Sequence, residues 1–270
     1  MIPAALVAAV AAAGSAPLAE AVGLIRPFLH DIGWFQAMLA EQLGAMAADL
    51  MHLPGFRASR QGGVRHLVLA RTERVWLTAT RVEAGQAPSR HIHFSGRVSL
   101  CRALNGVPAG EGWRLDGERA VATGMRACAA GGVMELDERR EALWLAPAAR
   151  PLMLLRAQVA PPGPVQARVH DRDNGRPIAC AQADEGHARA LMLLSLLRLQ
   201  GRQDAAAAFV AALEAPLPGQ RWAVMREYLA LDTRQALPAL RTMAGREVDP
   251  AVRGLAMRTL AQVEGVACPA

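Results

Sequence analysis

A pair of histidines, His91 and His93, is separated by one residue in the segment PSRHIHFSGR. The segment has the character of a β-strand, and side chains two residues apart on a strand project from the same face. Two imidazoles on one face can bind a divalent transition metal, or they can form a polar patch that becomes cationic below about pH 6.5. The first alternative would point to an enzyme, and the second to a binding protein.

The residues around the pair resemble a known motif. Gly85 precedes His91 by five intervening residues, which gives the pattern G-x5-H-x-H. This resembles the first half of the first cupin motif, and the resemblance implies a jelly-roll barrel in which the two histidines bind a metal with a glutamate and a further histidine. Here Arg97 or Val98 stands at the glutamate position, and the next histidines are His170 and His187. We therefore expect the cupin-like fold with no cofactor, and keep a divalent transition metal on His91 and His93 as the alternative.

Three zones of composition predict an α+β protein. Residues 1–55 and 183–270 carry apolar residues at helical spacings of three and four, whereas residues 56–182 consist of short runs rich in Val, Leu, Thr and Trp. Gly, Pro, Asn and Asp separate these runs, as in an antiparallel sandwich or barrel. We predict an N-terminal helical segment, a central β-sandwich or jelly roll, and a C-terminal helical domain.

The expected strands include HIHFSGRVSLCRAL, taken as one run, and a hairpin in VQARVHDRDNGRPIACAQA. Asn174 and Gly175 are typical residues of the hairpin turn. The stretch HDRDNG does not fit a calcium loop, because counting from Asp171 places glycine fifth instead of sixth. The other expected strands are VRHLVLA, RVWLTATRV, GVMELD, EALWLA and PLMLLRAQV.

The first zone is predicted to be helical throughout. No basic residue precedes Arg26, so the apolar N-terminal run is interpreted as a helix of the mature protein and not as a signal peptide. No stretch of about 18 uninterrupted apolar residues occurs elsewhere, so we expect a cytoplasmic protein with no membrane partner. A further helix before Pro54 shows one apolar stripe, made of Phe35, Met38, Leu39, Leu43, Met46 and Leu50.

Five helices of similar length are predicted after residue 184. The segment LPALRTMAGREVDPAVRGLAMRTL resembles a HEAT repeat, and the resemblance implies an array of helices that docks a protein partner. The residues that carry it are Asp249, Pro250, Val252, Arg253 and Ala256.

Three arginines, Arg221, Arg226 and Arg241, are predicted to line the concave face of this array as binding residues. Trp222 and Met225 recur at helical spacing, so we expect them to pack in the core instead.

Charge is concentrated in the middle of the chain. All 30 basic residues are arginines, and the abundance of alanine beside them indicates a bacterial genome of high GC content. Residues 57–126 hold 12 arginines and five acids, so their net charge is 12 − 5 = +7. This segment could attract an anion or a nucleic acid, although aromatic residues for stacking on bases are few, at 4%.

The sequence favours a binding protein over an enzyme. We predict a scaffold or regulatory protein whose helices dock a partner protein and whose basic β-domain contacts an acidic partner or a small anion. The β-domain residues assigned to binding are His91, His93 and Arg97. The alternatives are a metal-dependent cupin-like enzyme that uses the two histidines, and a regulator associated with nucleic acid.

Overall fold

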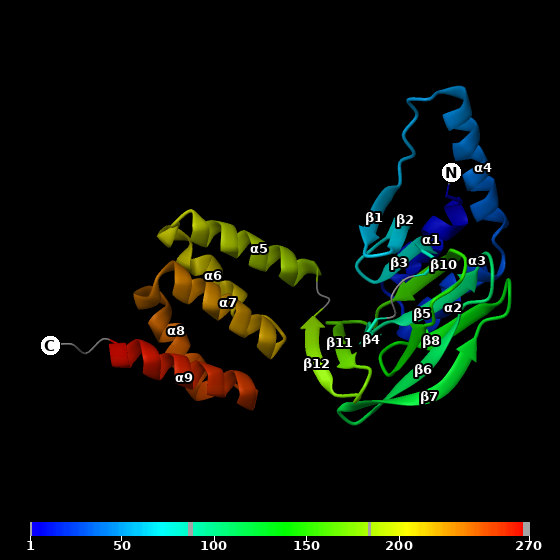
Figure 1. The fold of residues 1–270 in the computed structure, drawn as a ribbon. Helices are drawn as coiled ribbons and strands as arrows, with labels where there is room; N and C mark the ends of the chain where they lie inside the picture. Colours follow the sequence, from blue (N-terminus) through cyan, green and yellow to red (C-terminus); the bar gives the residue numbers. More distant parts are fainter. Residues whose placement is uncertain (1, 86–88, 183–184, 267–270) are drawn as a thin grey trace. The chain divides into compact units, whose positions relative to one another are not determined.

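The computed structural model describes residues 2–85, 89–182 and 185–266 (Figure 1). The chain divides into two compact units, residues 1–183 and residues 184–270. The first unit holds the N-terminal helices and every strand, and the second is helical. The predicted class is therefore confirmed: N-terminal helices, a central set of antiparallel sheets and C-terminal helices. No helix among the described residues is long and apolar enough to span a membrane.

Four helices precede the sheets and pack onto one of them. Buried residues of α1 such as Leu6 and Val10 share a core with buried residues of the sheet such as Leu77 and Leu100. The expected N-terminal helix is thus part of the folded core. The helices are α1 (Ala4–Ala13), α2 (Leu18–Ile25), α3 (Pro27–His30) and α4 (Gly33–Ala48).

The strands form three antiparallel sheets. A six-stranded sheet has the order β1-β2-β3-β10-β5-β8, and two three-stranded sheets have the orders β12-β11-β4 and β7-β6-β9. The strands are β1 (Arg57–Gln61), β2 (Val64–Arg71), β3 (Val75–Val82), β4 (His91–Phe94), β5 (Val98–Ala103), β6 (Ala109–Asp116), β7 (Arg119–Ala127), β8 (Val133–Asp137), β9 (Glu141–Leu145), β10 (Leu152–Val159), β11 (Gln166–Asp171) and β12 (Pro177–Gln182).

The run HIHFSGRVSLCRAL is not one strand, as predicted, but two strands in different sheets. The chain leaves β4, turns at Ser95–Arg97 and enters the six-stranded sheet as β5. Gly96 makes the turn with a φ of 73°, and a Cβ atom there would lie 2.4 Å from the carbonyl oxygen of Gln166. Glycine is therefore required at this crossing. The predicted hairpin of β11 and β12 is confirmed, with Gly175 at a φ of 68°.

The six-stranded sheet has two unlike faces, because side chains alternate along each strand. On β3, for example, Val75, Leu77 and Ala79 pack against the helices, whereas Thr78 and Thr80 point to the other side, where they form polar contacts. Figure 1 shows the helices on one side of this sheet and the smaller sheets elsewhere in the unit. The face away from the helices is the one that lines the candidate site.

Arginines of the basic segment fasten the helices to the sheet. Arg74 donates from Nη1 to the carbonyl oxygens of Gly14 and Ala16, at 3.0 and 2.8 Å. Arg102 donates from Nη1 to the carbonyl oxygen of Leu29, at 2.9 Å. Carbonyl groups at helix C-termini lack partners within the helix, so these contacts satisfy them. Part of the positive charge in residues 57–126 therefore has a structural role.

The apolar stripe predicted on α4 is only half buried. Phe35 and Met38 lie in the core, whereas Leu43 and Met46 are exposed. Helix α4 ends at Ala48, before the predicted boundary, and Leu50 is 94% exposed.

The second unit contains the five predicted helices. They are α5 (Glu185–Leu199), α6 (Ala206–Ala212), α7 (Pro218–Leu231), α8 (Thr233–Arg246) and α9 (Pro250–Val266), with a short 3₁₀ turn at Gln203–Ala205. Asp249 caps α9 as predicted, because its Oδ1 accepts from the backbone N–H groups of Ala251 and Val252 at 3.0 Å. Met225 is fully buried, as its spacing predicted. The closer likeness to HEAT repeats stays a prediction.

Candidate functional site

The inner face of the six-stranded sheet borders a cavity of about 400 Å³, within the size range of small-molecule sites. Strands β4 and β9 contribute the opposite wall through His93, Leu143 and Leu145. The lining is mixed: one part is aliphatic, and the other carries hydroxyl, imidazole, thiol, carboxylate and guanidinium groups. The polar lining residues are His66, Thr80, His93, Ser99, Cys101, Glu138 and Arg156.

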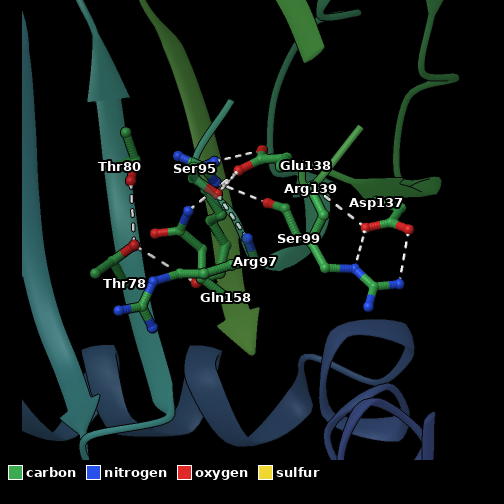
Figure 2. A network of polar contacts seen from close by, with 10 residues as sticks. Thr78, Thr80, Ser95, Arg97, Ser99, Asp137, Glu138, Arg139 and Gln158 are labelled. Carbon is green, nitrogen blue, oxygen red and sulfur yellow. Dashed lines mark hydrogen bonds and ion pairs between the residues drawn. The ribbon is translucent and has the colours of Figure 1, made fainter. Parts of the chain in front are cut away.

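The buried carboxylate of Glu138 organises the polar part of the lining (Figure 2), and it pairs with Arg156, whose side chain is partly exposed. Arg156 donates from Nη2 to Glu138 at 2.5 Å and from Nε to Ser99 Oγ at 2.9 Å. The second carboxylate oxygen of Glu138 accepts from Ser95 Oγ at 2.5 Å and from Gln158 Nε2 at 3.3 Å. Glu138 is only 7% exposed. Such a carboxylate is stable because every neighbour is a donor.

Arg97 is buried and belongs to the interior, not to a surface patch with the histidines. It is 4% exposed, and its guanidinium carbon lies 4.6 Å from the centroid of the Trp76 ring. Arg71 lies 4.3 Å from the centroid of the same ring. An indole ring attracts cations through its π face, so Trp76 holds two guanidinium groups. Arg97 therefore does not share the exposed surface of His91 and His93, contrary to the predicted patch.

The structure does bring His91 and His93 together. Their ring centroids are 6.3 Å apart on the same face of β4, while Ile92 and Phe94 fill a small core on the other face. His93 also lines the cavity. Burial, together with the neighbouring His91, lowers the pKa of His93 below its ordinary value. The side chain is therefore neutral at pH 7.

Two further titratable groups face the cavity. His66 contacts Thr80 Oγ1 through Nδ1 at 3.0 Å, and burial followed by the charge of Arg156 lowers its pKa. Burial raises the pKa of the Cys101 thiol to about 11. A thiol with this pKa is protonated at pH 7, so Cys101 is not an activated nucleophile.

The donor set does not fit the metal alternative. No group of three or more His, Cys, Asp or Glu side chains that could hold a metal ion occurs within the described ranges. Catalytic metal sites usually have three protein ligands, and Arg97, at the position of the expected acid, packs on Trp76 instead. His91 and His93 thus form a pair without a third ligand among the residues that the structure describes.

The three arginines predicted to bind a partner have different surroundings. Arg221 is held by Glu247 at 2.6 Å and by the carbonyl oxygen of Ala215 at 2.9 Å, so it joins two parts of the helical unit. Arg241 pairs with Glu264 on the surface at 2.9 Å. Arg226 is exposed. That these arginines bind a partner stays a prediction. Arg226 and Arg241 are exposed, whereas the guanidinium of Arg221 is held by Glu247.

Sequence reasoning missed most of the cavity lining. It identified His93, but Glu138 and Arg156 lie in segments that it treated only as a turn and a strand. Glu138 follows β8 directly, and Arg156 is a charge in the otherwise apolar run PLMLLRAQV. The charged Arg156 within an apolar strand was the available signal, since a charged side chain is rarely buried unless it has a partner.

We predict that Glu138→Gln lowers the free energy of unfolding by about 2 kcal/mol, because it leaves the partly buried Arg156 guanidinium without its counter-charge. Urea unfolding followed by circular dichroism measures the change. Asp137→Asn is the matched control: Asp137 pairs with Arg139 at 2.7 Å, and both side chains are more exposed. This control should cost less than about 1 kcal/mol. Equal costs for the two variants would contradict the organising role of Glu138.

No protein-family model matches the chain, and no curated protein matches it. Among solved structures, it is similar to an RmlC-like cupin protein from Ralstonia eutropha JMP134, with 13% identity, coverage of 51% of this chain and 82% of that chain, and a TM-score of 0.32. An RmlC-like cupin from Shewanella frigidimarina NCIMB 400 shows 10% identity, coverage of 40% and 86%, and a TM-score of 0.30. The hydroxypropylphosphonic acid epoxidase from S. wedmorenis shows 17% identity, coverage of 40% and 57%, and a TM-score of 0.31. A likeness at this level carries no weight for the chemistry of the site, which depends on the side chains described above.

Proposed function

We propose that this chain is a non-enzymatic binding protein whose β-domain takes up a compact organic anion in the cavity and whose helical unit docks a protein partner. The observation that carries the proposal is the mixed lining of the cavity. A space that was merely a structural core would be apolar, as the centre of the helix-facing side of the same sheet is. Polar groups that converge at one side of an apolar space are typical of small-molecule sites.

The charges of the lining support an anion with an apolar body. Glu138 is the carboxylate among the lining residues, and it is already engaged by Arg156, Ser95 and Gln158. The other ionisable groups on the wall are the Arg156 guanidinium, which is paired with Glu138, two imidazoles and a protonated thiol. A ligand carboxylate can therefore approach without meeting an unpaired negative charge, and the aliphatic side chains would cover the rest of the ligand.

The imidazoles would couple binding to protonation. His66 and His93 both have lowered pKa values, so both are neutral at pH 7. A carboxylate beside them stabilises their protonated forms and raises their pKa values. By linkage, the same carboxylate binds more tightly as the pH falls toward the pKa values of the free protein, because the cavity then gains positive charge.

We predict that benzoate, as a compact carboxylate with an apolar ring, binds the full chain with an affinity that rises several-fold between pH 7.5 and pH 5.5. Titration calorimetry at the two pH values measures this, since the carboxylate itself stays ionised over the range. His66→Asn should reduce the pH dependence, because one of the two imidazoles is removed. The control His30→Asn changes an exposed histidine of α3 and should leave the dependence as it is.

The alkylation rate of Cys101 tests whether the ligand binds in the cavity. It lines the cavity, whereas Cys180 is exposed on β12. Benzoate should slow the alkylation of Cys101 at pH 9 without changing the alkylation of Cys180, as resolved by mass spectrometry. Equal protection of both cysteines, or binding that does not respond to pH, would count against the proposed function.

The helical unit supports protein docking through an apolar stripe on α5. Its residues are exposed and share one side of the helix, whereas Leu194 on the other side is buried in the core. Exposed apolar clusters of this kind mark interaction surfaces. We infer that the stripe packs against an apolar face of another protein. It consists of Met192, Leu193, Leu196 and Leu199, which are 58%, 57%, 48% and 71% exposed.

We predict that the double variant Leu193→Glu/Leu196→Glu abolishes chemical cross-linking of the chain to its partner in cells, because charges on the stripe cannot be desolvated. Met257→Glu is the matched control, since Met257 is 56% exposed on α9, away from the stripe in sequence. Quantitative mass spectrometry compares the cross-linked proteins. An unchanged set in the double variant would contradict docking through α5.

A further inference from the structure

A second and larger cavity lies on the opposite, helix-facing side of the six-stranded sheet. Its volume is about 690 Å³. The first turns of α4 form one wall through Ile32, Phe35 and Leu39, and strands β1 to β3 form the floor. Further apolar contributions come from Leu67, Ala79, Leu104 and Met153. We call this space the α4 groove. Most side chains that line it from the sheet project toward the helices, whereas the cavity of the proposed function lies on the other face, and His66 borders both spaces.

Three arginines form a row across adjacent strands at this groove. Arg60 on β1 is directly opposite Arg65 on β2, and Arg65 is directly opposite Arg81 on β3. Directly opposite residues project from the same face of a sheet. All three line the α4 groove, and all three are exposed, so the row forms part of its rim.

The three arginines of the row carry more positive charge than the carboxylate paired with them neutralises. Glu83 pairs with both Arg65 and Arg81, at 3.2 and 3.1 Å. Arg60 donates to the carbonyl oxygen of Gly62 at 3.3 Å, and no carboxylate pairs with it in the described part of the chain. Three guanidinium groups thus share one carboxylate. Like charges directly opposite one another destabilise a sheet, so an additional anion at this position would relieve the repulsion.

Together, the apolar floor and the arginine row define a ligand with two parts. We propose that the α4 groove binds the free anion of a long-chain fatty acid, with the carboxylate at Arg60, Arg65 and Arg81 and the hydrocarbon chain along the apolar wall of α4. The carboxylate forms charge-assisted, bidentate contacts with the guanidinium groups. The chain replaces water at the partly exposed side chains of Ile32 and Leu39. The volume of the groove lies in the range of small-molecule sites.

The test measures the binding of decanoate, dodecanoate and dodecanol to the full chain by calorimetry, below the concentrations at which these compounds aggregate. Each added methylene should tighten binding by about fourfold, because it removes apolar surface from water. Dodecanol should bind at least tenfold more weakly than dodecanoate, because it lacks the charge that the arginines recognise.

Two variants separate the arginine row from other positive charges. Arg65→Gln removes the charge at the centre of the row but keeps a polar side chain, and it should weaken dodecanoate binding at least tenfold, with little effect on dodecanol. Arg57→Gln is the matched control, because Arg57 is on β1 but projects from the opposite face, as its partner Val68 does. It should bind dodecanoate as the unmodified protein does.

Three results would overturn the proposal: equal affinities for decanoate and dodecanoate, equal affinities for dodecanoate and dodecanol, or equal losses in Arg65→Gln and Arg57→Gln. Benzoate competition separates this proposal from the function proposed for the inner cavity. Saturating benzoate should leave dodecanoate binding in place, because the two ligands occupy opposite faces of the sheet. Full displacement of dodecanoate by benzoate would show a shared site and contradict the inference.

Discussion

The ion pair between Glu138 and Arg156 is the interaction on which the β-domain depends most. Two charges removed from water are stable only when each finds its partner and further hydrogen bonds. Here Glu138 follows β8, Arg156 stands on β10, and Ser95 lies in the crossing between two sheets. The pair therefore joins three parts of the fold at one point. Its requirement for donors also explains why this face of the sheet is polar.

The six-stranded sheet supports two spaces of opposite character. On its helix-facing side, many side chains are apolar, a row of arginines lies on β1 to β3, and Arg102 on β5 contacts α3. On its inner side, polar groups stand in the centre of the sheet, around Arg156. The alternation of side chains along a strand makes both possible within the same eight residues of β3. The two ligands that we propose are therefore assigned to opposite faces of one sheet.

The sequence was sufficient to predict the zones and the five C-terminal helices, because these depend on local periodicity and on caps such as Asp249. It was not sufficient to predict β6, which is absent from the expected strands. Gly110 is needed there because a Cβ atom would lie 2.1 Å from the carbonyl oxygen of Trp144. Most of the cavity lining could not be predicted either. His93 was identified, but His66 and Arg156, which line the same cavity, come from strands far away in the sequence. Contacts between distant strands leave no local pattern.

The most direct test of the ligand cavity follows the side chains of His66 and His93 by nuclear magnetic resonance while benzoate is added. The account predicts that both imidazoles shift together, saturate at the same ligand concentration and titrate at a higher pH when benzoate is bound. His52, which contacts Gln42 outside the cavity, should not respond. Unchanged signals of His66 and His93, or equal shifts of all three histidines, would contradict the claim that the inner face of the sheet is a binding site.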